Sequence, residues 1–260
     1  MIEECPNELF KVAEKSLEAS SKIIKKYFRK SVDINEKLDG TIVSVADKET
    51  ETIIRAIISQ ECPEHGIIGE EFEDINPNSE FKWILDPIDG TQSFITGKPI
   101  FGTLIALYFK DKPILGIIDQ PIINERWIGK VSNITTFNGF QIKTSTKELL
   151  SDCFMESTSP FLFDKLQKQK FLNLVESTKK TGWGSDCYAY GLLANGYIDI
   201  ICESNLKFYD FAAIVPVIEG AGGKITDWQG NNLNIHSDGN ILASANSIIH
   251  KKALKILQNN

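Results

Sequence analysis

A change in the hydrophobic pattern along the chain restricts its fold more than any other feature. Residues 81–140 contain short apolar or alternating runs separated by Gly, Pro and Asn turns, among them KWILD, FGTLIALYF, PILGIIDQP and RWIGKV. Runs of this length and period are typical of strands joined by tight turns. We therefore predict an antiparallel sheet in this part of the chain.

After residue 150, strands and helices are expected to alternate. Strand patterns occur in CFMEST, YIDIICES and ILASAN, and helical patterns occupy residues 161–178, 185–196 and 209–223 and the C-terminal end. The third helix is expected to end at Gly222 and Gly223, because glycine favours helix C-termini. The chain is predicted to combine an α+β half, residues 1–145, with an α/β half, residues 146–260, and the halves are expected to share one interface.

The N-terminal region predicts two helices. Apolar side chains recur at helical spacing in residues 8–29, with lysines and glutamates opposite, which indicates a long amphipathic helix. A second helix is expected over residues 47–59, because Ser44-x-x-Asp47 resembles a capping box. The short apolar strand GIIG follows and runs into acidic residues.

Composition narrows the classes of function. The 260 residues carry a net charge of −7, whereas nucleic-acid binding needs a basic face, so no nucleic-acid partner is expected. The longest apolar run, FGTLIALYF, is much shorter than the roughly 20 residues of a membrane span, and the N-terminus has no signal-peptide pattern. The five cysteines form no C-x-x-C pair and are interpreted as reduced thiols. We expect a cytoplasmic protein without membrane contact.

Spacing excludes several chemistries of phosphate transfer. No cysteine has an arginine six positions later, no Arg-His-Gly run is present, and no Gly-rich P-loop occurs. His65, His236 and His250 lack the spacing of a zinc site and are interpreted as surface or structural residues. Acidic side chains are the candidates that remain.

Acidic residues follow or precede apolar runs at three places. Glu70 and Glu71 end one strand-like run, Asp86 and Asp89 end another, and Asp210 stands before the apolar helix FAAIVPVIEG. If these ends converge, the carboxylates would repel one another unless cations lay between them. Clustered hard oxygen ligands favour Mg²⁺ or a similar ion.

Pro87 is expected to stiffen the segment between the two aspartates. It fixes its own φ and restricts Asp86, so Asp86 and Asp89 are predicted to diverge as a rigid pair with the Ile88 carbonyl between them. The Asp-Gly-Thr sequence that follows is expected to begin a short helix whose backbone N–H groups could hold a phosphate.

Each acid taken alone also has a structural interpretation. Asp86 and Asp89 could simply form turns, and Glu70 could be a solvated strand end. Asp210 could be a helix N-cap, and Asp47 an acid in the first turn of its helix. The apolar residues that lead directly into Asp86, with Gly and Thr behind, favour the functional interpretation.

Three motifs together resemble the inositol monophosphatase family of Mg²⁺-dependent phosphomonoesterases. They are GEE at 69–71, WILDPIDGTQSF at 83–94 and YDFAAIVPVIEGAGG at 209–223, and their order and spacing fit from about residue 40 to 225. The resemblance implies a layered αβαβα sandwich of the sugar-phosphatase type, with the site between the two halves. It also implies a small phosphorylated metabolite as substrate and a homodimer.

The resemblance also implies the roles of individual residues. Two or three Mg²⁺ ions would be held by Glu70, Asp86, the Ile88 carbonyl, Asp89 and Asp210. Thr91, with Asp47 behind it, would orient a metal-activated water, and Glu70 would take part in catalysis. The backbone of Gly90 and Thr91 would hold the phosphate, with Asp89 and Asp210 beside the substrate.

Several segments look most like the histidinol-phosphatase branch of that family, among them GIIDQPIINERWIG and WGSDCYAYGLLANGYIDI. Tyr209 stands where the inositol-hydrolysing branch typically has Trp. Histidinol carries an ammonium and an imidazole, so Asp186 and Glu203 are predicted to help bind it. A helix N-cap for Asp186 and a strand-end acid for Glu203 are equally favoured. The alternatives are an inositol-1-monophosphatase, a broad sugar or nucleotide monophosphatase, and a non-catalytic member of the family.

Overall fold

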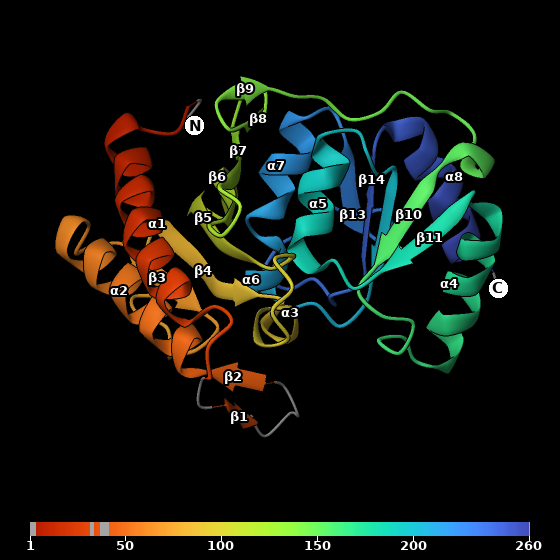
Figure 1. The fold of residues 1–260 in the computed structure, drawn as a ribbon. Coiled ribbons are helices and arrows are strands. Elements are labelled where there is room, and N and C mark those ends of the chain that lie inside the picture. The colour runs from red at the N-terminus through yellow and green to blue at the C-terminus, as the bar shows by residue number, and fades with distance from the viewer. Residues whose placement is uncertain (1–3, 32–33, 37–41, 260) are drawn as a thin grey trace.

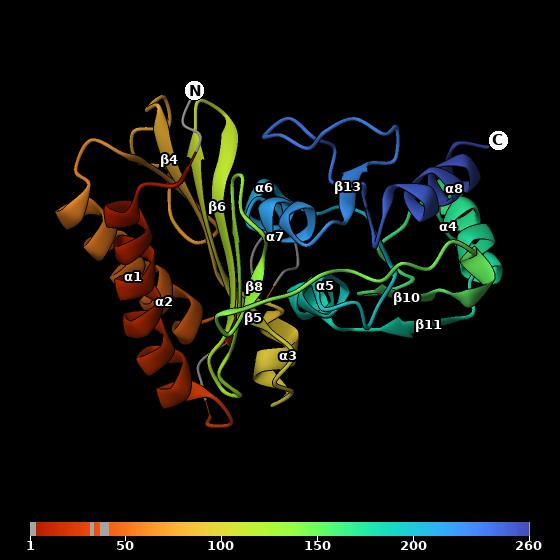
Figure 2. The same ribbon diagram turned by 90° about the horizontal axis from the view of Figure 1, so that it is seen from above.

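Five layers alternate along one direction of the molecule, and their order is helices, sheet, helices, sheet, helices (Figures 1 and 2). The computed structural model describes residues 4–31, 34–36 and 42–259. The predicted layered αβαβα sandwich is confirmed.

The first helical layer consists of α1 (Asn7–Tyr27) and α2 (Val45–Glu61). The predicted capping box is present at the start of α2, where Ser44 and Asp47 satisfy each other's backbone N–H groups. A two-stranded antiparallel sheet precedes this helix and consists of β1 (Ile34–Glu36) and β2 (Ile42–Ser44). The sequence patterns did not predict these two strands.

The first large sheet has the strand order β3-β4-β5-β6-β7-β8-β9. Its strands are β3 (Gly66–Gly69), β4 (Phe81–Asp89), β5 (Gly102–Phe109), β6 (Lys112–Gln120), β7 (Glu125–Lys130), β8 (Thr136–Phe137) and β9 (Phe140–Gln141). All neighbours from β4 to β9 are antiparallel, as predicted, and β3 pairs with β4 in parallel. The central strands β4, β5 and β6 are buried over most of their length because helices cover both faces.

The second sheet has the order β11-β10-β12-β14-β13 and mixes parallel and antiparallel pairs. Its strands are β10 (Phe154–Ser157), β11 (Lys180–Trp183), β12 (Ile200–Glu203), β13 (Lys224–Asp227) and β14 (Ile241–Ser244). The strands β10, β12 and β14 were predicted. The short strands β11 and β13 were not, because each lies at an edge and carries few apolar side chains.

The middle layer contains α5 (Asp186–Ala194), α6 (Phe208–Phe211) and α7 (Ile214–Gly220). The predicted single helix over residues 209–223 is divided into α6 and α7: Ala212 and Ala213 keep right-handed helical backbone angles, but they belong to neither helix. Pro216 explains the break: it has no N–H to donate to Ala212, and its ring would collide with that carbonyl in a continuous helix. The segment of α6 and α7 approaches the first sheet closely. A Cβ at Gly116 would lie 2.0 Å from the Ala213 carbonyl oxygen, so only glycine fits there.

The outer layer contains α4 (Lys165–Ser177) and α8 (Ser247–Gln258), with a short 3-10 helix (Leu150–Asp152) before β10. Helix α4 begins later than predicted, because Asp164 and Gln167 form a capping box there. Separate apolar cores lie between the successive layers. The core between the two sheets contains Leu104, Trp127 and Ile201.

The chain runs from the first sheet into the second after β9, along the segment that ends near residue 150. Because both sheets pack on the same middle helices, the division into residues 1–145 and 146–260 stays a prediction. None of the helices within the described residues is long and apolar enough to cross a membrane.

His250 gives the fold a pH dependence that can be measured. Its side chain is 3% exposed and bonds to Thr226 Oγ1 (2.8 Å) and Ser244 Oγ (3.2 Å), and burial lowers its pKa to about 4. The unfolded chain therefore takes up a proton near pH 6.5 that the folded chain does not, so this contribution to stability is lost as the pH falls from about 6.5 to 4.

We expect the stability of the wild-type protein relative to His250→Gln to decrease over this pH range, because glutamine cannot gain the proton. Urea unfolding at pH 7.5 and at pH 5 measures the difference between the two proteins. A difference that did not change with pH would show that His250 is not buried in its neutral form.

Candidate functional site

A bulge at the end of β4 brings Asp86 and Asp89 to the same place. Asp86 pairs with Leu104 and Asp89 with Gly102, so β4 has one residue more than β5 between these pairs. The bulge contains Pro87, which has no N–H for the ladder, and the buried Thr103 hydroxyl donates to the Pro87 carbonyl at 2.8 Å. In a regular strand, residues three apart point to opposite faces, so the bulge is what turns both acids to one side.

Asp210 reaches the same place from helix α6. Carboxylate oxygens of Asp86, Asp89 and Asp210 all lie within 4.8 Å of one another. The two aspartates of β4 therefore converge on a third acid, and the prediction that they diverge is wrong. Asp210 is the third residue of α6, and its Oδ2 accepts from the N–H of the N-cap residue Lys207 at 2.6 Å. The N-cap interpretation of Asp210 is therefore wrong, although its side chain does stabilise the start of the helix.

Asp86 is the most buried of the three acids. Its side chain is 2% exposed, and Oδ1 has no hydrogen-bond partner among the residues that the structure describes. Burial, then the charges of Glu70 and Asp89, raise its pKa well above the usual range. A buried acceptor without a donor is costly, and carboxylate oxygens grouped in this way could hold a metal ion.

Asp89 is oriented by the second half of the chain. Its Oδ2 accepts from the backbone N–H of Cys187 at 2.6 Å, in the first turn of α5. The N-terminus of a helix stabilises a negative charge, and this bond opposes the rise in the pKa of Asp89 that burial and the Asp186 charge produce. The two halves of the chain thus meet at this carboxylate.

Glu70 lies next to the cluster, directly after β3. It is not one of the three acids within 4.8 Å, but its charge raises the pKa of Asp86 and of Asp47. A buried ion pair holds the adjacent loop: Glu51 Oε1 accepts from Arg55 Nε at 2.7 Å, and Glu51 Oε2 accepts from the Glu71 N–H at 2.8 Å. The guanidinium of Arg55 also donates to the carbonyls of residues 72 and 73.

Thr91 and Asp47 are in contact, as their predicted roles require. Thr91 Oγ1 lies 3.2 Å from Asp47 Oδ1 and 3.1 Å from the Ile88 carbonyl oxygen. Asp47 is fully buried, its Oδ2 accepts from the N–H and hydroxyl of Ser44, and burial raises its pKa to about 6. The capping interaction fixes Asp47, and its other oxygen is left to face Thr91.

Gly90 and Thr91 begin the short helix α3 (Thr91–Ile95), as predicted. Gly90 has φ +86°, and a Cβ there would lie 2.7 Å from Asp186 Oδ2, so a side chain is excluded on two grounds. Asp186 is not the N-cap of α5, because it is the first helical residue and its Oδ2 accepts from the Ser93 hydroxyl at 3.0 Å. The N-cap interpretation of Asp186 is therefore wrong.

Glu203 ends β12 with its side chain buried at 2% exposure. Its Oε1 accepts from the Thr158 N–H at 2.7 Å and the Thr158 hydroxyl at 3.0 Å. Burial raises its pKa to about 8, and these two bonds oppose the rise. The charge of Asp186 also raises the pKa of Glu203.

Sequence patterns missed the residues that hold the acids in place. Thr103, Ser93 and the Cys187 N–H are separated from their partners by 10 residues or more, so no local pattern reveals them. The spacing of four between Glu51 and Arg55 on α2 was a usable signal for an ion pair.

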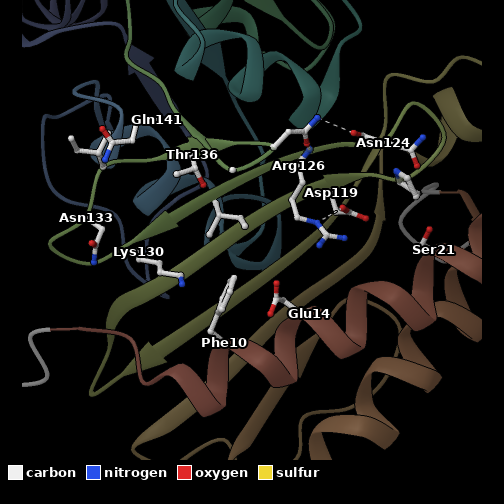
Figure 3. Close-up of a pocket in the computed structure, with 15 residues that line it drawn as sticks. Phe10, Glu14, Ser21, Asp119, Asn124, Arg126, Lys130, Asn133, Thr136 and Gln141 are labelled. Carbon is white, nitrogen blue, oxygen red and sulfur yellow. Dashed lines mark hydrogen bonds and ion pairs between the residues drawn. The ribbon is translucent and has the colours of Figure 1, made fainter.

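A cavity of about 680 Å³ lies elsewhere, between α1 and the strands β6 to β9 (Figure 3). Phe10, Asp119, Arg126 and Lys130 are among its lining residues, and Arg126 is paired with Asp119 at 2.6 Å. None of the described residues that line it belongs to the predicted site.

The model of the inositol monophosphatase family matches residues 6–260. The chain belongs to this family. It is 47% identical over 250 residues to the bifunctional phosphatase IMPL2, chloroplastic, of Arabidopsis thaliana, covering 93% of this chain and 72% of the relative. It is 32% identical over 245 residues to the histidinol-phosphatase of Chlorobaculum parvum, covering 93% of each.

A solved inositol monophosphatase from Zymomonas mobilis has the same fold. The TM-score is 0.87 at 40% identity, over 96% of this chain and 97% of that one. The family membership supports a phosphoric monoester hydrolase and leaves open which ester this member of the inositol monophosphatase family hydrolyses.

Repulsion within the cluster gives a test that needs no substrate. In a chelator at pH 8, Asp86→Asn should raise the free energy of unfolding by about 1–3 kcal/mol, because the amide removes a charge and can donate to a neighbouring acid. Asp119→Asn is the matched control, since Asp119 is also buried but is paired with Arg126, and it should lower stability. Equal losses in both variants would contradict repulsion at Asp86.

Proposed function

We propose that this protein is a Mg²⁺-dependent phosphomonoesterase that hydrolyses L-histidinol phosphate to L-histidinol and phosphate. The observation that carries the proposal is the convergence of Asp86, Asp89 and Asp210, with the buried Asp86 Oδ1 unpaired among the described residues. The names of the two relatives agree with a phosphatase, and that of the Chlorobaculum protein agrees with this substrate.

The donor set fits Mg²⁺. The proposed ligands are all hard oxygen atoms: the carboxylates of Asp86, Asp89, Asp210 and Glu70, and the Ile88 carbonyl, which accepts from Thr91. Two or three ions held there would neutralise the clustered charge, polarise the phosphate ester and lower the pKa of a water molecule. The convergence of acids on an unpaired oxygen is hard to reconcile with a purely structural role.

Thr91 and Asp47 would orient the attacking water. Because a hydroxyl has one proton, a bond from Thr91 Oγ1 to Asp47 leaves its lone pairs free to accept from water. Asp47 is buried, and its Oδ2 accepts two bonds from Ser44. These bonds hold its Oδ1 in place to accept the proton of Thr91. Glu70, whose charge raises the pKa of Asp47, would also take part in catalysis.

The phosphate would bind at the backbone of Gly90 and Thr91. Gly90, with its positive φ, is the N-cap of α3 directly after β4, and the first N–H groups of a helix have no partner within it. Asp89 and Asp210 would lie beside the bound substrate.

Asp186 and Glu203 would favour a cationic leaving group. Asp186 is half-buried and Glu203 is buried, both have raised pKa values, and a nearby ammonium or imidazolium would stabilise their ionised forms. Asp186 lies against Gly90 and Glu203 lies at the end of β12, so the two could face different parts of one alcohol. A neutral alcohol would bring no positive charge to either carboxylate.

A broader substrate range is the second candidate. It is favoured by the word bifunctional in the name of the Arabidopsis relative and by the likeness to the Zymomonas protein, an inositol monophosphatase. A non-catalytic role is the third, and the complete set of acids, with Thr91 in contact with Asp47, argues against it. A cytoplasmic homodimer remains part of the proposal.

Phosphate release from histidinol phosphate, inositol 1-phosphate and an adenosine bisphosphate tests the substrate. With Mg²⁺, we expect kcat/KM to be at least about tenfold higher for histidinol phosphate, the effect of one charge-assisted hydrogen bond. Equal turnover of all three would contradict the specific proposal.

Asp86→Asn should lower kcat by about 100-fold or more on every ester, and an active variant would show that Asp86 is not needed.

Recognition of the cation is tested by Glu203→Gln. We expect the KM for histidinol phosphate to rise about tenfold and the KM for inositol 1-phosphate to change less than twofold, because only the first loses an ion pair. Glu219→Gln is the control, since Glu219 is an exposed acid on α7 that pairs with Lys224. Equal losses for both esters would remove Glu203 from cation recognition.

A further inference from the structure

Tyr190 is a buried phenol that the proposed mechanism does not use. It lies on α5, is 2% exposed, and its hydroxyl has no hydrogen-bond partner within the part of the chain that the structure describes. The phenolic oxygen is shielded from bulk water by the residues packed around it. A phenylalanine would fill the same space without burying an unused polar group.

Tyr190 lies on a helix that contacts the acids of the site. The first turn of α5 donates the Cys187 N–H to Asp89, and Tyr190 lies one turn further along, four residues after Asp186. The same helix packs against β12, the strand that ends at Glu203. After burial, the charge of Glu203 is the largest influence that raises the pKa of this phenol, followed by that of Asp89.

Glu203 has acceptor capacity that the folded chain does not use. Both bonds from Thr158 go to Oε1, at 2.7 and 3.0 Å. Oε2 is approached only by the Ser157 hydroxyl, at the long distance of 3.5 Å, among the described residues. A buried ionised carboxylate needs donors on both oxygens.

We propose that Tyr190 is a positioning residue for Glu203: its hydroxyl donates to Oε2 when a cationic substrate binds, and so fixes the carboxylate that receives the positive charge. The phenol has a proton to donate, and Glu203 Oε2 has the capacity to accept it. This inference rests on the proposed function, in which Glu203 contacts the leaving alcohol.

Tyr190→Phe tests the inference. With Mg²⁺, the KM for histidinol phosphate should rise about tenfold, whereas kcat and the KM for inositol 1-phosphate should change less than twofold. The melting temperature of the substrate-free variant should be equal to or higher than that of the wild type, because the removed hydroxyl is unpaired. Tyr188→Phe is the control on the same helix, since the Tyr188 hydroxyl bonds to Glu125 at 2.6 Å. It should leave the KM for both esters unchanged.

Calorimetric titration with L-histidinol separates this inference from the proposed function, because it requires no hydrolysis. We expect the Kd for histidinol to rise about tenfold in Tyr190→Phe and not in Tyr188→Phe. A wild-type protein that hydrolysed no ester would contradict the proposed function, and the titration would still test Tyr190. An unchanged Kd in Tyr190→Phe, or equal losses for both esters, would overturn the role of Tyr190.

Discussion

The surrounding structure must hold Asp86, Asp89 and Asp210 together against the repulsion among their carboxylates. Three carboxylates within 4.8 Å, one with an unpaired buried oxygen, would separate if the backbone allowed it. The bulge of β4 holds two of them through Pro87 and the Thr103 bond to its carbonyl. The stability of the rest of the fold is what keeps the acids together.

Each acid is held by a different part of the chain. The N-terminus of α5 donates to Asp89, and the capping interaction at the start of α6 holds Asp210. The loop after β3, which carries Glu70, is tied to α2 by the buried pair of Glu51 and Arg55. The site therefore exists only where the two sheets meet on the middle helices, and neither sheet provides it alone.

Much of this arrangement could be predicted from the sequence, because its signals are local. The period of the strands from residue 81 onward predicted the antiparallel sheet, and the motif around Asp86 predicted the acids and the short helix after Gly90. The break at Ala212 was missed, although Pro216 was a local signal for it. Contacts such as the Cys187 N–H with Asp89 depend on how distant segments pack, so spacing along the chain could not reveal them. The unpaired hydroxyl of Tyr190 is likewise visible only when its neighbours are known.

Anomalous diffraction from crystals soaked in Mn²⁺, which binds the same oxygen ligands as Mg²⁺, tests the central claim most directly. We predict at least one strong peak about 2–2.3 Å from the carboxylates of Asp86, Asp89 and Asp210, and its loss in Asp86→Asn crystals. No peak within reach of these three acids, or a peak unchanged in the variant, would contradict the account of a metal site at the junction of the two sheets.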